Sequence, residues 1–311
     1  MECIRPLNAG WDNTGTVTFN QKQLEKGLIG FKVPCRKCIP CLLNMSREKA
    51  VRALHEAQTR EDSIFLTLTY NDESIPLNGR LDYHDFQLFM RKLRKQAKKE
   101  GILERVSYMV TGEYGEETKR PHWHALIFGY RPSDAQHQYT NGRGDFVFTS
   151  DTVSKLWGHG FINFGQLTLE SASYVARYGA KALGHKGDHK FKPKHVTSCR
   201  PGLGKKWIEK YYKQTFEHGY VYVNNQKFTI PRYYEDWCKE NQPEMYQKYL
   251  TGKKMEIIEN AEKRQRKEEL EYFSRVWNRE HGEPLIPTRN QVKHKILERK
   301  FNRLKEKQKL C

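Results

Sequence analysis

The segment RPHWHALIF (Arg120–Phe128) is the sharpest local signal in the sequence, because it combines a strand pattern with two histidines. Side chains two residues apart on a strand point to the same face, so His122 and His124 present their imidazoles side by side while Trp123 faces the other way. Two converging imidazoles suit a divalent metal ion. The competing interpretation is that both histidines merely flank a packed tryptophan, and a His-x-His pattern alone does not separate the two.

The residues before this strand supply a candidate third ligand. A strand is predicted over Arg105–Glu113, and the turn after it would fold the chain back onto His122 as a hairpin. The carboxylate of Glu113 would then lie near the imidazoles and leave open positions on a metal ion for phosphate oxygens and water. Glu116 and Glu117 are alternative ligands, although turn residues are usually solvated.

The surrounding sequence predicts an α+β fold. Strand-like and helical patterns follow one another as strand, helix, hairpin, helix, strand, helix, which suggests an antiparallel sheet with helices packed on it. The predicted strands are residues 64–70, 105–113, 122–130 and 161–167. The predicted helices are residues 46–59, 82–99, 152–157 and 170–183. Residues 132–144, between the third and fourth strands, are predicted to form a loop.

Composition divides the chain into three regions. Residues 1–45 are an irregular lead-in that contains cysteines, residues 46–185 hold the predicted sheet, and residues 186–311 form a basic, mainly helical region. The last region contains a predicted loop, a helix and a small hairpin, at residues 186–206, 207–214 and 220–230. Residues 289–311 hold nine Lys or Arg against two Glu. We interpret them as a basic helix or arm, although a solvated helix face has the same composition.

The overall charge points to nucleic acid. The 311 residues include 55 Lys and Arg against 37 Asp and Glu, a formal net charge of +18. Self-repulsion on this scale disfavours a compact state unless a polyanion offsets it. A membrane is not an expected partner, because the sequence has neither a long apolar run nor an amphipathic helix with a wide aromatic face. The first residues do not resemble a secretory leader, so we expect a cytoplasmic protein.

A second chemical motif is SYVARYGAK (Ser173–Lys181), within the last predicted helix of the sheet region. Residues four apart on a helix share a face, so Tyr174 and Tyr178 lie one above the other, and Lys181 follows on that face. A tyrosine hydroxyl attacks phosphorus only when its anion is stabilised, as a nearby ammonium group or metal ion can do. Two helical tyrosines alone also suit an ordinary core stripe; the lysine and the separate metal motif favour chemistry.

Taken together, these segments resemble the three motifs of the HUH rolling-circle replication initiators. The matching segments are FLTLTY (Phe65–Tyr70), Gly112–Glu113 with PHWH (Pro121–His124), and YVARYGAK (Tyr174–Lys181). The paired tyrosines and the lead-in PCRKCIPC (Pro34–Cys41) look most like the initiators of microviruses, particularly the gokushovirus branch that includes chlamydia phages. The resemblance covers residues 30–185, and three motifs in the same order are far more specific than any one of them.

The resemblance implies an HUH endonuclease-like fold and a metal-dependent nicking and joining enzyme. In this family a divalent ion, commonly Mg or Mn, is held by the two histidines and an acidic or polar residue, and it polarises the scissile phosphate. His122 and His124 correspond to those histidines. Glu113 is our candidate for the third ligand, the position at which family members differ.

The resemblance also implies roles for the tyrosines. One of them attacks single-stranded origin DNA, forms a 5′-phosphotyrosyl link and frees a 3′-hydroxyl that primes synthesis. The other cuts the regenerated origin after one circuit, and the freed 3′-hydroxyl closes the first circle. Tyr174 and Tyr178 would be these nucleophiles, and Lys181 their charge partner.

Other functions and partners stay open at this point. The same chemistry would serve a plasmid relaxase or a transposase, and the charge alone would suit a non-catalytic nucleic-acid binder. The segment GLGKK (Gly202–Lys206) lacks the first glycine and the Ser or Thr of a phosphate-binding loop. Since no helicase motif is found, we expect a host helicase and polymerase to act beside the protein.

The seven cysteines do not form a disulfide pattern, because they are few and odd in number and because Cys35, Cys38 and Cys41 crowd together. Their two-residue spacing suits a structural zinc ion, or less readily an iron–sulfur cluster. Cys3 would complete the set if the N-terminus folds back. The alternative is that the three thiols are simply buried.

Overall fold

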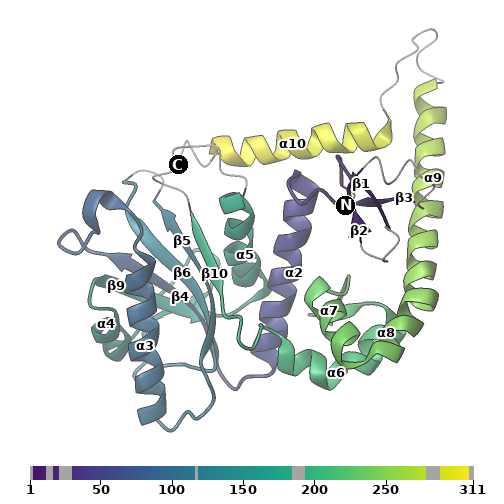
Figure 1. Ribbon diagram of the computed structural model, residues 1–311. Helices are drawn as coiled ribbons and strands as arrows, with labels where there is room; N and C mark the ends of the chain where they lie inside the picture. The colour runs from purple at the N-terminus through teal and green to yellow at the C-terminus, as the bar shows by residue number, and fades with distance from the viewer. Residues whose placement is uncertain are drawn as a thin grey trace.

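A seven-stranded antiparallel sheet forms the part of the molecule on the left of Figure 1. The computed structural model describes residues 3–11, 17–20, 30–115, 118–183, 193–277 and 288–307. The strands of this sheet are β4 (Ser63–Tyr70), β5 (Ser107–Tyr114), β6 (Pro121–Phe128), β7 (Gln136–Thr140), β8 (Phe146–Thr149), β9 (Gly160–Gln166) and β10 (Lys194–Thr197). Their order is β10–β5–β6–β4–β9–β8–β7, and every neighbouring pair is antiparallel. The predicted α+β fold is confirmed.

Helices cover both faces of the sheet (Figure 1). One face packs against α3 (Tyr83–Lys99) and α4 (Asp151–Trp157), and the other against α2 (Ile39–Gln58) and α5 (Leu169–Leu183). The strict alternation of buried residues along β4 is the cause, because its even-numbered side chains all enter the core beneath α3. The odd-numbered side chains therefore face α2 and α5.

The C-terminal region packs on the far side of α2. Its first elements are α6 (Lys205–His218), the hairpin of β11 (Val221–Val223) and β12 (Gln226–Phe228), α7 (Arg232–Asn241) and α8 (Pro243–Tyr249). Phe216 and Tyr234 of this region share one hydrophobic core with Ala50 of α2 and Ala176 of α5. The predicted helix and hairpin are both present.

Two long helices follow α8, after a π-helical turn at Leu250–Lys254. They are α9 (Met255–Trp277) and α10 (Arg289–Lys307), and α10 runs from the α9 side back across the molecule (Figure 1). The helix α10 is strongly basic, with eight Lys or Arg and two Glu. Within the described ranges, no helix is both long and apolar enough to cross a membrane.

The N-terminal part of the chain departs from the sequence prediction. The helix expected to begin at Ser46 begins at Ile39, because Pro40 occupies the first turn, where a missing N–H group costs nothing. The boundary that the sequence predicts between the N-terminal lead-in and the sheet region, after residue 45, therefore falls inside α2. The lead-in is not irregular throughout, since it contains a small three-stranded sheet of β1 (Leu7–Trp11), β2 (Val17–Thr18) and β3 (Gly30–Val33).

The prediction of a loop was also wrong in part for two segments, because each contains a strand. Residues 132–144 contain β7. All of its side chains are exposed, so the segment lacks the alternation of apolar and polar residues by which a strand is predicted. Residues 186–206 contain β10, a four-residue strand whose only sheet partner is β5, far away in sequence. Both strands lie at the outer edges of the sheet, where pairing rather than burial defines them.

Candidate active site

Glu113, His122 and His124 converge on the α5 face of the sheet. Glu113 of β5 lies directly opposite His122 of β6, and Thr111 lies opposite His124, so all four side chains share one face. The Oε1 atom of Glu113 is 3.0 Å from Nε2 of His124 and 3.5 Å from Nε2 of His122. All three ligand atoms lie within 4.8 Å of one another. The hairpin expected from the sequence is present, and it brings the three candidate ligands together.

Tight packing on the opposite face holds this hairpin flat. Gly112 lies directly opposite Trp123, the residue between the two histidines. A Cβ atom at Gly112 would come within 2.5 Å of the Trp123 ring. Glycine therefore lets the buried indole pack against the backbone immediately beside Glu113.

Hydrogen bonds on the outer ring nitrogens orient both imidazoles. Nδ1 of His122 is 3.2 Å from the carbonyl oxygen of Arg120, and Nδ1 of His124 is 3.0 Å from Oγ1 of Thr67. Because a carbonyl only accepts, a neutral His122 carries its proton on Nδ1 and turns the Nε2 lone pair toward Glu113. Burial lowers the pKa of His124 and so favours the neutral ring, although the neighbouring Glu113 acts in the opposite direction.

The donor set fits a divalent cation. Two ring nitrogens and one carboxylate oxygen converge within 4.8 Å of one another, and each can give a lone pair to a positive ion once any proton between them has left. Glu113 is buried, so its charge has little access to water. The imidazoles are each fixed through the nitrogen that faces away from the carboxylate, as is usual for histidine ligands. These residues can hold a metal ion.

Tyr174 lies beside this group. Its hydroxyl donates a hydrogen bond of 2.9 Å to Oε1 of Glu113, and its ring meets the His124 ring edge to face, with the centroids 5.2 Å apart. The helix α5 comes this close because small and apolar side chains bury its inner face, at Ala172, Val175 and Ala176. The structure therefore brings one of the two candidate nucleophiles to the candidate metal ligands.

Four other residues named from the sequence are not placed in the same detail. Tyr178 lies on α5 one turn beyond Tyr174, and Lys181 lies three residues further along the helix. The side chains of both are outside the described part of the structure. Glu116 and Glu117, the alternative ligands, are also outside the described residues.

Three residues that sequence reasoning missed lie on the same face. Thr67 of β4 is opposite His124, and Thr69 is opposite His122. Phe161 of β9 is in turn opposite Thr69, and its side chain is 69% exposed. The alternation of leucine and threonine in β4 was a signal for polar side chains facing the histidines. Nothing local in the sequence marks Phe161 as exposed.

The cysteines form a separate cluster. The Sγ atom of Cys3 joins those of Cys35, Cys38 and Cys41 at the start of α2, all within 4.8 Å of one another. The N-terminus therefore folds back onto the other three cysteines, as the interpretation with Cys3 as a fourth ligand required.

Comparison with known proteins places the chain in a family. The family model of replication-associated proteins of the ORF2 type matches residues 63–183, from β4 to the end of α5. The chain is 49% identical over 316 aligned residues to the replication-associated protein VP4 of Bdellovibrio phage phiMH2K, which covers 100% of both proteins. It is 31% identical to the replication-associated protein ORF2 of Spiroplasma virus 4, over 84% of this chain and 88% of that protein.

A third relative is the replication-associated protein ORF4 of Chlamydia phage 1, which is 29% identical over 68% of this chain and 54% of its own length. No solved structure matches. The segment shared with the family model contains Glu113, His122, His124 and both tyrosines. The chain belongs to the family of phage replication-associated proteins.

Proposed function

We propose that this protein initiates rolling-circle DNA replication by nicking single-stranded origin DNA with a tyrosine and later rejoining the ends. The observation that carries the proposal is the hydrogen bond from the Tyr174 hydroxyl to Glu113, the same carboxylate that faces both histidines. A tyrosine that served only as core packing would not need its hydroxyl beside three metal-binding groups. Replication is also what the names of the phage relatives describe.

Glu113, His122 and His124 would hold one divalent ion, Mg or Mn. Such an ion would polarise the scissile phosphate and lower the barrier to attack on phosphorus. Three protein ligands leave coordination positions free for phosphate oxygens. The proposed nicking domain is residues 46–185, and residues 186–311 would form the basic region that follows it.

The position of the Tyr174 hydroxyl beside Glu113 supports attack by this tyrosine on the scissile phosphate. The Tyr174 oxygen forms a bond to phosphorus and the bond from phosphorus to the 3′ oxygen breaks, leaving a 5′-phosphotyrosyl link. The hydrogen bond to Glu113 would hold the Tyr174 oxygen beside the ion, and the hydroxyl proton passes to solvent as the oxygen attacks. The leaving 3′ oxygen takes up a proton and becomes the 3′-hydroxyl that primes synthesis.

The second round would use Tyr178, one turn further along α5, with Lys181 stabilising the tyrosinate. Rejoining is the reverse reaction, in which a 3′-hydroxyl attacks the phosphotyrosine and releases the tyrosine. Two tyrosines on one helix allow a second cut before the first link is resolved. Unwinding and synthesis would be left to a host helicase and polymerase, in the cytoplasm of the host cell.

A nicking assay with a covalent readout tests the proposal. A single-stranded origin oligonucleotide labelled at its 3′ end is incubated with the protein and Mn²⁺, and labelled protein is separated on a denaturing gel. We expect a labelled adduct from the wild type and from the control Tyr139→Phe, and none from the double variant Tyr174→Phe with Tyr178→Phe. An adduct from the double variant would contradict the mechanism, and cleavage that persists in EDTA would contradict the metal site.

A further inference from the structure

Four cysteine thiols from two distant parts of the chain meet at the start of α2. The Sγ atoms of Cys3 and Cys38 are 3.8 Å apart, and those of Cys35 and Cys41 complete a group within 4.8 Å. Four sulfurs bound tetrahedrally at about 2.3 Å from a zinc ion would lie about 3.8 Å from one another. All four cysteines are free thiols, so no disulfide explains their approach.

Backbone N–H groups donate to two of the four sulfur atoms. The N–H group of Cys35 donates to Sγ of Cys3 at 3.2 Å, and the N–H group of Cys38 donates to Sγ of Cys35 at 3.4 Å. Hydrogen bonds of this kind stabilise thiolates, the form of cysteine that binds metal. Cys41 lies in the first turn of α2, at the positive end of the helix dipole.

We infer that Cys3, Cys35, Cys38 and Cys41 bind one structural zinc ion that joins the N-terminal sheet to α2. Cys3 precedes β1 while Cys35 and Cys38 follow β3, so the ion would close both ends of this sheet. Each thiol loses its proton as its sulfur bonds to zinc. Four protein ligands leave no open position, so the site would be structural rather than catalytic.

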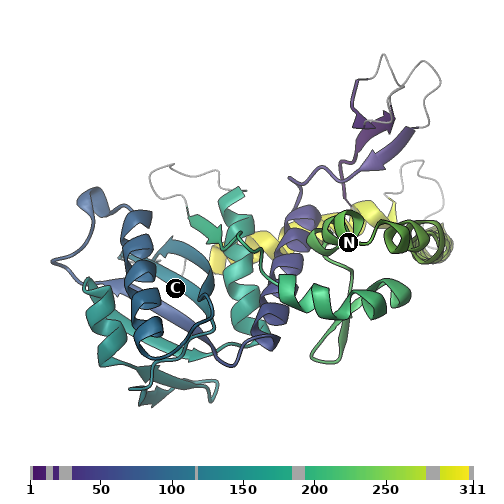
Figure 2. The same ribbon diagram turned by 60° about the horizontal axis from the view of Figure 1, so that its bottom comes forward.

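Few of the described side chains of this sheet are buried. Among its residues whose burial is described, only Ala9 and Gly10 of β1 are buried. Figure 2 shows the sheet standing off the body of the molecule, at the beginning of α2. Modules too small for a hydrophobic core commonly depend on a metal ion.

Metal analysis and cobalt substitution of the full chain test the inference. Protein purified under reducing conditions should hold one zinc ion per chain after dialysis against Mg²⁺ buffer. Co²⁺ bound in its place should give the intense near-ultraviolet charge-transfer band of cobalt–thiolate bonds. The Glu113 site contains no sulfur, so the double variant His122→Ala with His124→Ala should keep this band.

Cysteine variants complete the test. Cys38→Ser should lose the zinc and the band, whereas Cys199→Ser, an exposed cysteine outside the cluster, should retain both. Wild-type protein that takes up neither zinc nor cobalt with a thiolate band would overturn the inference, whether or not any variant folds. Bound iron with inorganic sulfide would overturn it as well. Nicking is a separate readout, so the proposed function can fail or succeed independently.

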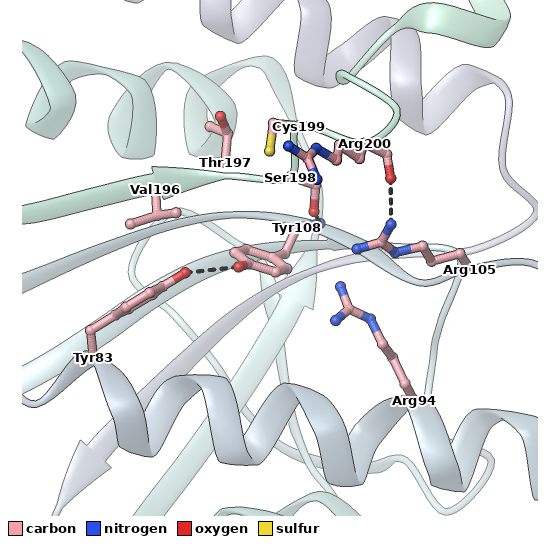
Figure 3. A pocket seen from close by; sticks show the side chains of 9 residues that line it. All are labelled: Tyr83, Arg94, Arg105, Tyr108, Val196, Thr197, Ser198, Cys199 and Arg200. Atoms are coloured by element: carbon pink, nitrogen blue, oxygen red, sulfur yellow. Dashed lines mark hydrogen bonds between the residues drawn. The ribbon is translucent and has the colours of Figure 1, made fainter.

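A different observation concerns a cavity of about 370 Å³ on the α3 side of the sheet, the face opposite the candidate active site. Figure 3 shows side chains from α3, β5 and the segment after β10 around it. Arg94, Arg105 and Arg200 line it, and no carboxylate does. The hydroxyls of Tyr83 and Tyr108 meet at 2.8 Å on its wall.

The cavity contains an unsatisfied positive group. Arg94 donates from Nε to the carbonyl oxygen of Val106 at 3.0 Å, but its Nη2 atom is buried and has no hydrogen-bond partner in the described structure. Burial and the neighbouring charge of Arg105 lower the pKa of Arg94. A buried guanidinium nitrogen without an acceptor is costly, and the Tyr108 ring, whose centroid is 5.7 Å from Cζ of Arg94, offsets part of this cost.

We propose that this cavity binds a phosphate group, either from a DNA strand or from a free nucleotide. Arginine pairs with phosphate through parallel hydrogen bonds, and the absence of a carboxylate removes the competing partner. The DNA source rests on the proposed function, whereas the nucleotide source does not.

Binding measurements in EDTA, where nicking cannot occur, test this proposal. For a DNA phosphate, Arg94→Ala and Arg105→Ala should each lower the slope of log Kd against log salt by about 1, while Arg91→Ala, an exposed residue outside the cavity, should lower it less. For a nucleotide, calorimetry with dATP should show binding that both variants lose. Wild-type affinities for DNA and dATP in both cavity variants would overturn the proposal, and Arg94→Lys serves as a folded control that keeps the charge.

Discussion

The hydrogen bond between Thr67 and Nδ1 of His124 controls which nitrogen of the ring faces Glu113. We predict that Thr67→Val, which keeps the shape and removes the hydroxyl, weakens Mn²⁺ binding by about 10- to 100-fold, because the ring loses its orienting partner. Calorimetric titration with Mn²⁺ measures this. Thr69→Val is the matched control, since Nδ1 of the opposing His122 already pairs with a backbone carbonyl. Equal losses in both variants would contradict an orienting role for Thr67.

Phe161 provides a prediction about substrate. It lies on the active-site face two strands from His122 and is exposed, as expected of a side chain on which a base stacks. Phe161→Ala should weaken binding of single-stranded DNA by about 1–3 kcal/mol, measured by fluorescence anisotropy in EDTA. Phe146→Ala removes an aromatic ring that is 62% exposed on the other face and should have little effect. A larger effect at Phe146 would place the DNA path elsewhere.

At the residue scale, the candidate ligands were predictable because their spacing is local. The two-residue period sets His122 and His124 on one face, and a tight hairpin returns Glu113 to them. The alternation along β4 marks Thr67 as polar, but its pairing with His124 was not predictable, because β4 and β6 are far apart in sequence. The close contact between Gly112 and Trp123 likewise exists only in the folded sheet.

At the element scale, Glu56 connects α2 to β5 and to the turn before α6. Its carboxylate accepts hydrogen bonds from Ser107 at 2.9 Å and from the N–H group of Gly204 at 2.9 Å, and it pairs with Arg60 at 2.7 Å. Glu56→Ala removes the partner of a buried Arg60, so we predict a loss of about 3–5 kcal/mol in the free energy of unfolding. Chemical denaturation measures it.

The control for this prediction is Glu104→Ala, which removes a half-exposed carboxylate that also pairs with Arg60. Surface pairs of this kind contribute about 0–1 kcal/mol, so the loss should be much smaller. Similar losses for the two variants would show that Glu56 does not hold the elements together.

The elements that the sequence predicted share strong periodicity, and those that it missed lack it. The helix α3 and the strand β4 each bury a regular stripe of apolar side chains. The edge strands β7 and β10 are short and polar, so only their hydrogen bonds to a neighbouring strand define them. The early start of α2 was hidden by Pro40, which breaks a helix interior but not its first turn.

At the scale of the whole molecule, His55 joins the sheet region to the C-terminal region. It lies on α2, stacks on the Trp207 ring with the centroids 3.6 Å apart, and hydrogen-bonds the hydroxyl of Tyr234 at 2.9 Å. Burial lowers the pKa of His55 to about 4, although a hydrogen bond to the carbonyl of Tyr222 opposes the shift. The folded protein therefore keeps this ring neutral at pH values where the unfolded chain protonates it.

A pH dependence of stability follows. Because the pKa of His55 is lower in the folded state than the unfolded value near 6.5, the free energy of unfolding should decrease as pH falls from 6.5 toward 4, by about 1.4 kcal/mol per pH unit. Urea unfolding at pH 7, 6 and 5 measures the slope. His55→Gln should reduce the slope, and the exposed control His84→Gln should not. An unchanged slope in His55→Gln would contradict the assignment of this pH dependence to His55.

We propose that a tyrosine of α5, at the site formed by Glu113, His122 and His124, becomes covalently attached to DNA. Mass spectrometry of the peptide–DNA adduct formed with an origin oligonucleotide and Mn²⁺ tests this attachment. We predict a nucleotide linked through its 5′ phosphate to the α5 peptide, at Tyr174 or Tyr178. A link to a residue outside α5, or through a 3′ phosphate, would contradict the account.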